Sequence, residues 1–168
     1  RYQYGGETEA ISPAAKRGEE LFFGEMMECY HCHGGFNFTD NVQHSLLPFA
    51  EIGFHNTGLY NLDGQGAYPA DNPGAVEFTG NPSDKGRIRT PSLRNVAVTA
   101  PYMHDGSIAT LEDVIRRHYA LAGRSTADTG QPSPMRSGLL VGFEASDEEV
   151  ADLLAFLNSL TDRSLLTD

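Results

Sequence analysis

The chain has no tryptophan, only two cysteines and few basic residues. No apolar run approaches the ~18 residues that a membrane-spanning helix needs, so the sequence excludes such a helix. With 12 Lys and Arg against 23 Asp and Glu, the formal net charge is −11, which makes nucleic acid an improbable partner. The 168 residues, with 18 glycines and 9 prolines, predict one loop-rich domain over 1–168, whose core is supplemented by something other than its own side chains.

Both cysteines lie in a single short motif, Cys29-Tyr30-His31-Cys32-His33. Two thiols at this spacing can each form a thioether with one vinyl group of a haem. The histidine that follows directly is then placed to ligate the iron. The motif therefore predicts one covalent haem c, attached through Cys29 and Cys32 and ligated by His33.

Three other uses of the two cysteines each lack a required part. A disulfide across so short a loop is often strained. A zinc site needs a second pair of Cys or His at zinc-finger spacing, and none follows. A thioredoxin-like dithiol belongs in a βαβ context, which the sequence does not suggest.

The helices predicted from local signals lie at the two ends of the chain. Ser12-Pro13 is a helix start, and the helix that it begins covers 14–23 and ends at Gly24. A second helix is predicted over 110–121, and Ser146 with Glu149 forms a capping box for a third, which extends to about residue 160.

The middle of the chain, residues 34–109, is predicted to be loop that wraps the haem or a neighbour, because turn signals recur along it. Short extended pieces are expected near 36–38 and 94–98. A short helix followed by the haem motif is typical of class I cytochromes. The predicted fold class is thus mainly α, a class I cytochrome c-like domain with long haem-wrapping loops.

The second axial ligand decides the chemistry of a haem. Methionine raises the reduction potential, histidine lowers it, and an open position permits peroxide or oxygen chemistry. Spacing alone does not choose among the candidates by residue type, which are Met103, Met135, His44, His55, His104, His118 and Tyr119.

Three segments resemble a known family. Residues 86–107, GRIRTPSLRNVAVTAPYMHDGS, look like the signature of the C-terminal haem domain in the bacterial di-haem cytochrome c peroxidase superfamily. Residues 29–40, CYHCHGGFNFTD, and 54–60, FHNTGLY, resemble more narrowly the MauG and MbnH branch. The resemblance extends from about residue 12 to 161.

The resemblance implies a two-haem enzyme of which this chain is one half. The N-terminal haem of such enzymes is five-coordinate and meets hydrogen peroxide, whereas the C-terminal haem is six-coordinate and handles electrons. In the MauG branch the distal ligand is a tyrosine, and Tyr119 stands at the matching position, with His118 as the fallback ligand. The N-terminal haem domain and its acid–base residues are absent from the 168 residues, so no catalytic residue is assigned here.

The family also implies a calcium ion between the haems, held partly by backbone carbonyls that correspond to Thr99 and Pro101. Oxygen donors suit Ca²⁺, which takes six to eight of them. Arg94 is the expected partner of a haem propionate, because a guanidinium matches a carboxylate. The lack of tryptophan departs from the MauG branch, which uses tryptophans to relay oxidising equivalents.

The function predicted from the sequence is the electron-transfer half of a peroxide-dependent di-haem oxidoreductase that oxidises a protein substrate. Its expected partners are the N-terminal haem domain or chain, a protein substrate or electron-transfer protein, and hydrogen peroxide at the other haem. The alternatives are a stand-alone periplasmic mono-haem cytochrome, or half of a classical di-haem peroxidase with Met103 or Met135 as ligand. Haem c is attached outside the bacterial cytoplasm, so we expect an exported, periplasmic protein.

Overall fold

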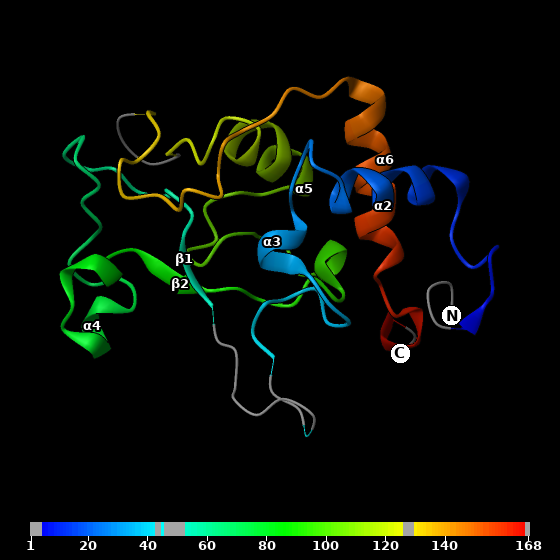
Figure 1. Ribbon diagram of the computed structural model, residues 1–168, viewed down its shortest axis with the longest axis horizontal. Helices are drawn as coiled ribbons and strands as arrows, with labels where there is room; N and C mark the ends of the chain where they lie inside the picture. Colours follow the sequence, from blue (N-terminus) through cyan, green and yellow to red (C-terminus); the bar gives the residue numbers. More distant parts are fainter. Residues whose placement is uncertain (1–4, 43–44, 46–52, 126–129, 167–168) are drawn as a thin grey trace.

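Helices and turns dominate the computed structural model, which describes residues 5–42, 45, 53–125 and 130–166 (Figure 1). The candidate ligand His44 lies outside these residues. The elements, in chain order, are α2 (Pro13–Phe23), α3 (Tyr30–His33), β1 (Phe54–Asn56), α4 (Val76–Thr79), η1 (Pro82–Asp84), β2 (Arg87–Arg89), η2 (Val96–Val98), α5 (Leu111–Asp113), η3 (Val114–Tyr119), α6 (Asp147–Ser159) and η4 (Arg163–Leu166). The expectation of a mainly helical fold is confirmed.

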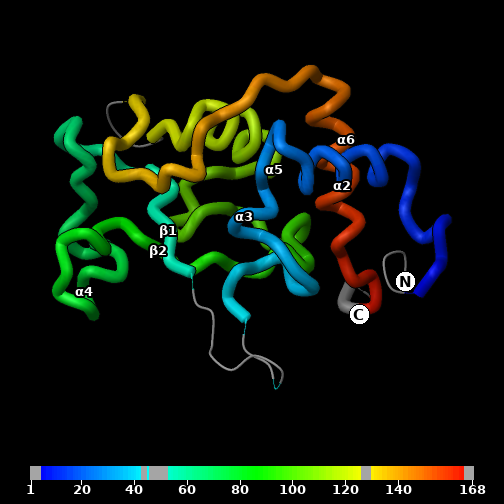
Figure 2. Tube along the Cα trace, viewed as in Figure 1, coloured from blue at the N-terminus to red at the C-terminus, as the bar shows by residue number. Residues whose placement is uncertain are grey.

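Helices α2 and α6, from opposite ends of the sequence, pack against each other and form the scaffold of the domain (Figures 1 and 2). Both predicted helices are confirmed, together with their caps. The Ser12 hydroxyl accepts a hydrogen bond from the Ala15 N–H at 3.1 Å. Both halves of the Ser146–Glu149 capping box are present. These caps satisfy N–H groups that a helix start leaves without partners.

The two helices approach closely at Gly18. A Cβ atom at this position would lie 2.0 Å from the backbone oxygen of Asp152, so only glycine fits there. In the residue directly before Gly18, the guanidinium of Arg17 donates two hydrogen bonds of 2.6 Å to the buried carboxylate of Asp152. The bidentate geometry fixes the register of α2 against α6.

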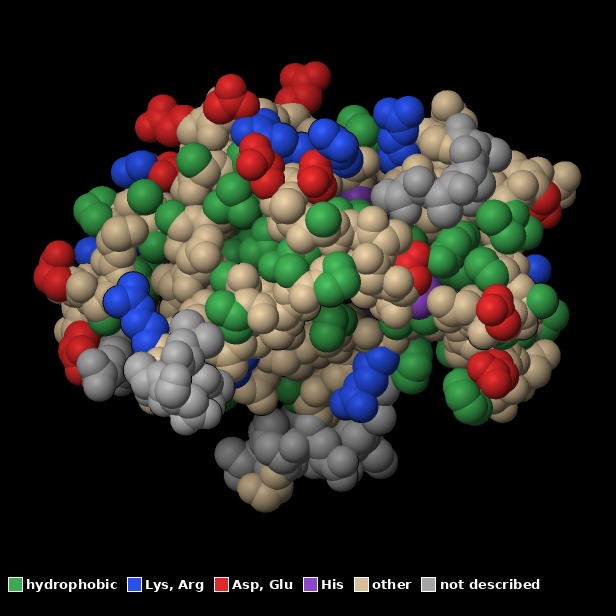
Figure 3. Space-filling view, turned by 180° about the vertical axis from the view of Figure 1, so that it is seen from behind, with side chains coloured by type: hydrophobic (Ala, Val, Ile, Leu, Met, Phe, Trp, Pro, Cys, Tyr) green, Lys and Arg blue, Asp and Glu red, His purple; other side chains and the backbone are tan. Residues whose placement is uncertain are grey.

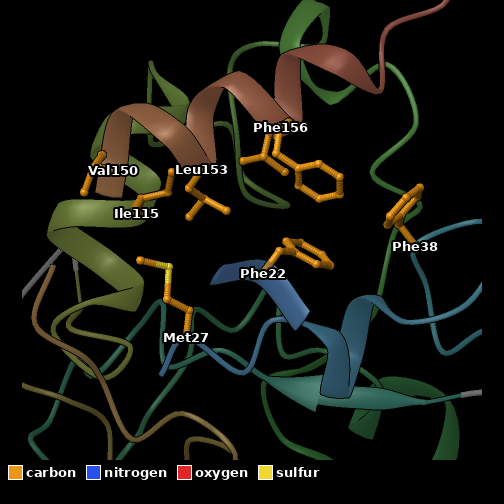
Figure 4. Close-up of a cluster of buried hydrophobic side chains, with 8 residues drawn as sticks. Phe22, Met27, Phe38, Ile115, Val150, Leu153 and Phe156 are labelled. Atoms are coloured by element: carbon orange, nitrogen blue, oxygen red, sulfur yellow. The ribbon is translucent and has the colours of Figure 1, made fainter. Parts of the chain in front are cut away.

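The main hydrophobic core lies between these helices and the segment that carries the cysteines (Figure 4). Phe22 of α2 and Phe156 of α6 face each other with ring centroids 5.2 Å apart. Met27 and Phe38, which flank the cysteine motif on both sides, belong to the same cluster, and Cys29 packs against it. The core therefore fixes both ends of the motif.

The helix predicted over 110–121 begins as expected, because the Thr110 hydroxyl accepts a hydrogen bond from the Asp113 N–H. After the three α-helical residues of α5, the chain continues as the π-helix η3. The Ala120 N–H donates to the Ile115 carbonyl at 2.8 Å, a step of five residues. A π-helical turn changes the direction in which the following side chains point and often occurs at functional sites.

The long middle segment contains mostly turns, as predicted, but the two short extended pieces were placed wrongly. Residues 36–38 form a turn in which Phe38 has φ +52°, and residues 96–98 form the 3₁₀-helix η2 after Asn95 at φ +63°. The actual strands, β1 and β2, form an antiparallel pair in which His55 faces Ile88. A positive φ is incompatible with an extended strand, which explains the difference.

The surface of the helical half carries many charges in close pairs. Figure 3 shows acidic side chains along the upper edge, with Lys and Arg side chains between them. Arg116 contacts Glu112 and Asp147, each at 2.8 Å, and Arg117 contacts Asp113 at 2.9 Å. Within the described part of the chain, no helix is long and apolar enough to cross a membrane.

Candidate functional site

The cysteine motif forms its own short helix, α3, which follows Cys29 directly. Cys29 and Cys32 are free thiols, each partly buried, and they are not joined to each other. The Cys29 Sγ lies 3.6 Å from the backbone oxygen of Met27. Both sulfur atoms thus remain available for bonds to a bound group.

The surroundings of the two thiols favour a neutral sulfur. Burial raises the pKa of Cys29 to about 12. Burial, and secondly the charge of Asp40, raise the pKa of Cys32 to about 11. A thioether sulfur is also neutral, so the surroundings of both cysteines fit covalent haem attachment.

His33 presents only one of its two ring nitrogens for ligation. Its Nδ1 lies 3.1 Å from the backbone oxygen of Phe38. Because a carbonyl can only accept, Nδ1 must carry the proton, which leaves the lone pair on Nε2. Burial lowers the pKa of this imidazole and so favours its neutral form. A neutral ring that is oriented by a hydrogen bond from its second nitrogen is the usual form of a metal-ligating histidine.

The structure brings Tyr119, at the end of η3, to the cysteine motif. The pKa of its phenol is raised first by burial and then by the nearby thiols of Cys32 and Cys29. A partly buried phenol close to both sulfurs fits a second ligand for a haem bound to this motif.

His118, the fallback ligand, has the same arrangement as His33. Its side chain is fully buried, and its Nδ1 lies 2.9 Å from the backbone oxygen of Arg124. Its Nε2 is buried without a partner among the described residues. The ring packs edge-on against Tyr119 with centroids 5.0 Å apart. His118 therefore stays the fallback ligand of the sequence prediction.

The remaining candidate ligands have other environments. The Nε2 of His55 lies 2.5 Å from Asp40. His104 is exposed and lies edge-on to Tyr60 at 6.1 Å. Met135 is 40% exposed, and Met103 occupies a turn with φ +69°. Within the described part of the chain, Met103, Met135 and His104 show no contact with the cysteine motif, whereas His55 pairs with Asp40 beside it.

Arg94 anchors the loop that follows the motif. Its Nη2 donates to the backbone oxygen of Phe36 at 2.5 Å, and its Nε donates to Oδ1 of Asn37 at 3.1 Å. The guanidinium also lies 4.3 Å from the centre of the Phe36 ring. Whether Arg94 also binds a haem propionate stays a prediction.

Thr99 and Pro101 are the expected calcium ligands, and both are exposed. The peptide bond between Ala100 and Pro101 is cis. Among the described residues, no backbone N–H donates to their carbonyl oxygens. Both oxygens are thus free to bind a cation. No group of three or more His, Cys, Asp or Glu that could hold a metal occurs within the described ranges.

Sequence reasoning did not find two parts of the site. One is the Phe38 carbonyl that orients His33, and the other is Asp40 with its partner His55. His55 was considered only as an iron ligand. The position of Asp40 shortly after the motif is the signal that could have indicated its role. Its partner His55 comes from another segment of the chain, so the pair leaves no local pattern.

Comparison with known proteins gives a consistent result. A family model described as cytochrome c matches residues 15–161. The cytochrome c peroxidase IdrP1 of Pseudomonas sp. (strain SCT) is 34% identical over 170 aligned positions, which cover 93% of this chain and 42% of the relative. The methylamine utilization protein MauG of Methylorubrum extorquens is also 34% identical, over 92% of this chain and 36% of its own length.

One solved structure resembles the chain strongly. It is the crystal structure of a MauG-like protein associated with microbial copper homeostasis, with 50% sequence identity and a TM-score of 0.87. The match covers 94% of this chain and 46% of that protein. The chain therefore spans less than half the length of these relatives.

Proposed function

This chain belongs to the cytochrome c family and is homologous to the di-haem peroxidase and MauG proteins over about 93% of its length, and we propose that it is the electron-handling half of a two-haem oxidoreductase. It carries one covalent haem c. The whole enzyme uses hydrogen peroxide to oxidise a protein substrate. The other half, with the second haem, lies in an N-terminal domain or a tightly bound chain.

Four side chains hold the haem in this proposal. Cys29 and Cys32 would form the two thioethers, and His33 and Tyr119 would ligate the iron. The haem supplies one-electron redox chemistry. Phe38 fixes the tautomer and the ring orientation of His33 through its carbonyl oxygen. Arg94 binds a propionate, and the carbonyls of Thr99 and Pro101 contribute to a calcium site between the two halves.

The observation that carries the proposal is the convergence of Tyr119 on the two cysteines. With both His33 and Tyr119 as ligands, the iron would have no position for peroxide, and the haem would accept and donate electrons. A phenolate is a hard, anionic donor that stabilises ferric and more oxidised iron. A site with these ligands stores oxidising equivalents better than it shuttles electrons reversibly.

We assign no catalytic acid or base to this chain, because in this proposal peroxide reacts at the haem of the other half. The relatives are named as a peroxidase and as MauG proteins, and they are more than twice as long as the match. The residues that meet peroxide accordingly belong to the other half. Since haem c is attached outside the bacterial cytoplasm, the protein acts in the periplasm.

The experiment is performed on the intact, natively expressed protein. Its mass and its pyridine haemochrome spectrum give the number of covalent haems, and stoichiometric peroxide is then added while the optical spectrum is followed. We expect two haems per complex and a spectral change in both of them. One haem in total, with no response to peroxide, would favour the stand-alone cytochrome and contradict the enzyme.

A further inference from the structure

Asp40 and His55 form a close pair beside the cysteine motif. The Nε2 of His55, on strand β1, lies 2.5 Å from Oδ2 of Asp40. Both side chains are 23% exposed. The pair joins the loop that follows α3 to a strand from the middle of the chain, and neither residue belongs to the four that are proposed to hold the haem.

The carboxylate of Asp40 is held from several directions. The side-chain amide of Asn41 donates to Oδ1 of Asp40 at 2.9 Å, while His55 holds Oδ2. The backbone N–H of Asp40 donates to the carbonyl oxygen of Cys32 at 2.8 Å. A carboxylate with both oxygens bound and its backbone tied to the motif has a fixed position relative to α3.

The side chain also has no room to move toward β1. A Cβ at Gly53 would overlap the Asp40 carboxylate. The neighbouring Thr39 hydroxyl donates to the buried backbone oxygen of Thr90 at 2.9 Å, which anchors the same loop. The negative charge of Asp40 is thus part of a rigid arrangement.

This charge lies beside the residues of the motif. The backbone N–H of Asp40 is bonded to the carbonyl oxygen of Cys32, the residue before His33. The same loop carries Phe38, whose carbonyl oxygen lies 3.1 Å from Nδ1 of His33. The carboxylate is therefore fixed on the short loop that also orients the proposed iron ligand.

We propose that Asp40, held in place by His55, is a positioning residue that lowers the reduction potential of the haem bound at Cys29, Cys32 and His33. The proposal rests on the haem site proposed above. Ferric haem carries one more positive charge than ferrous haem, so a fixed carboxylate stabilises the ferric form relative to the ferrous form. In a partly buried site this interaction is screened less than at the surface.

The lower potential suits a centre that stores oxidising equivalents. Tyr119 as an anionic ligand and Asp40 as a fixed negative charge near the motif would both favour oxidised iron. The role of Asp40 is thus electrostatic as well as structural. A purely structural role would predict that a neutral residue of nearly the same shape leaves the potential unchanged.

The test is the variant Asp40→Asn in the intact, haem-loaded protein. The amide has nearly the shape of the carboxylate but no charge. A redox titration that follows the EPR signal of the haem at this motif gives its midpoint potential. We expect an upward shift in Asp40→Asn, with the haem still attached in full stoichiometry by mass and pyridine haemochrome.

The matched control is Asp84→Asn. Asp84 is 19% exposed and pairs with Arg87 at 3.4 Å, so it is a similar ion-paired carboxylate in another segment. We expect Asp84→Asn to leave the potential unchanged. An unchanged potential in Asp40→Asn, or an equal shift in both variants, would overturn the proposal.

A second variant covers the case in which Asp40→Asn does not mature with haem. His55→Gln retains an N–H donor for the carboxylate but cannot carry a positive charge, so the potential should stay at or below that of the native protein. A rise in His55→Gln would contradict the proposal. If the native protein has no haem at this motif, the proposed function fails as well, whereas a bound haem with an unshifted potential overturns the role of Asp40 alone.

Discussion

The phenol of Tyr119 lies close enough to the thiol of Cys32 for the thiol to raise the pKa of the phenol, although α5, two strands and most of the loops separate the two residues in the sequence. Two features produce this proximity. The core around Phe22 and Phe156 fixes α3 against the α2–α6 pair, and Ile115 of η3 packs into the same core. The site is therefore a consequence of how the helices share one apolar cluster.

Replacing Tyr119 with Phe should change the ferric haem without detaching it. The ring remains, but the oxygen that we propose as distal ligand is lost, so the iron becomes five-coordinate or binds water. The optical and EPR spectra of the ferric protein measure this change in ligation and spin state.

Tyr102→Phe is the control for that experiment. The Tyr102 hydroxyl donates to the backbone oxygen of Val96 at 3.1 Å, away from the cysteine motif. This variant should retain the native ferric spectrum. Identical spectra for Tyr119→Phe and the native protein would show that the distal ligand is another residue.

Gly18→Ala should destabilise the fold, although alanine is the better helix former by about 1 kcal/mol. The added Cβ would lie 2.0 Å from the Asp152 backbone oxygen and 2.9 Å from the Phe156 Cβ, so α2 and α6 must move apart. Overpacking of this kind costs about 1–3 kcal/mol. Chemical unfolding of the haem-loaded protein measures the loss.

Glu20→Ala provides the comparison, because Glu20 is exposed on the same helix and surface substitutions usually stay within ~0.5 kcal/mol. If Gly18→Ala were as stable as Glu20→Ala or more stable, the close approach of α2 and α6 would be wrong.

The parts of the fold that the sequence predicted are those with local causes. Ser12 with Pro13 and Ser146 with Glu149 start their helices through contacts within a few residues, so both starts were predictable. The haem attachment motif was also predictable, because its chemistry depends only on the spacing of Cys29, Cys32 and His33. The turn at Phe38 was not predicted, because its positive φ depends on contacts with residues far along the chain.

The parts that escaped prediction depend on contacts between distant segments. The β1–β2 pair is only three residues long on each side, too short for a periodic pattern. The π-helix η3 begins inside a sequence that reads as ordinary α-helix. The position of Tyr119 followed from the family resemblance, and the pairing of His55 with Asp40 followed from neither pattern nor resemblance.

The capping box at the start of α6 should make stability depend on pH through Glu149. Its carboxylate accepts hydrogen bonds from the Ser146 N–H at 2.7 Å and from the Ser146 hydroxyl at 2.8 Å. The bond from the Ser146 backbone N–H, and secondly the bond from its hydroxyl, lower the pKa of Glu149. Because the pKa of Glu149 is lower in the folded state, its stabilising effect is fully present above the pKa of the unfolded state, about 4.3. The effect is lost as the pH falls through the pKa of the folded state.

Glu149→Gln should therefore have a lower Tm than the native protein near pH 7. The difference should shrink at acidic pH, below the unfolded pKa of about 4.3, as the native carboxylate becomes protonated. Thermal unfolding across this pH range measures the difference directly. Glu148→Gln removes a neighbouring carboxylate that is not part of the capping box, and its effect should be smaller at neutral pH. A difference between Glu149→Gln and the native protein that stays constant with pH would mean that the hydrogen bonds to Ser146 do not depend on the charge of Glu149.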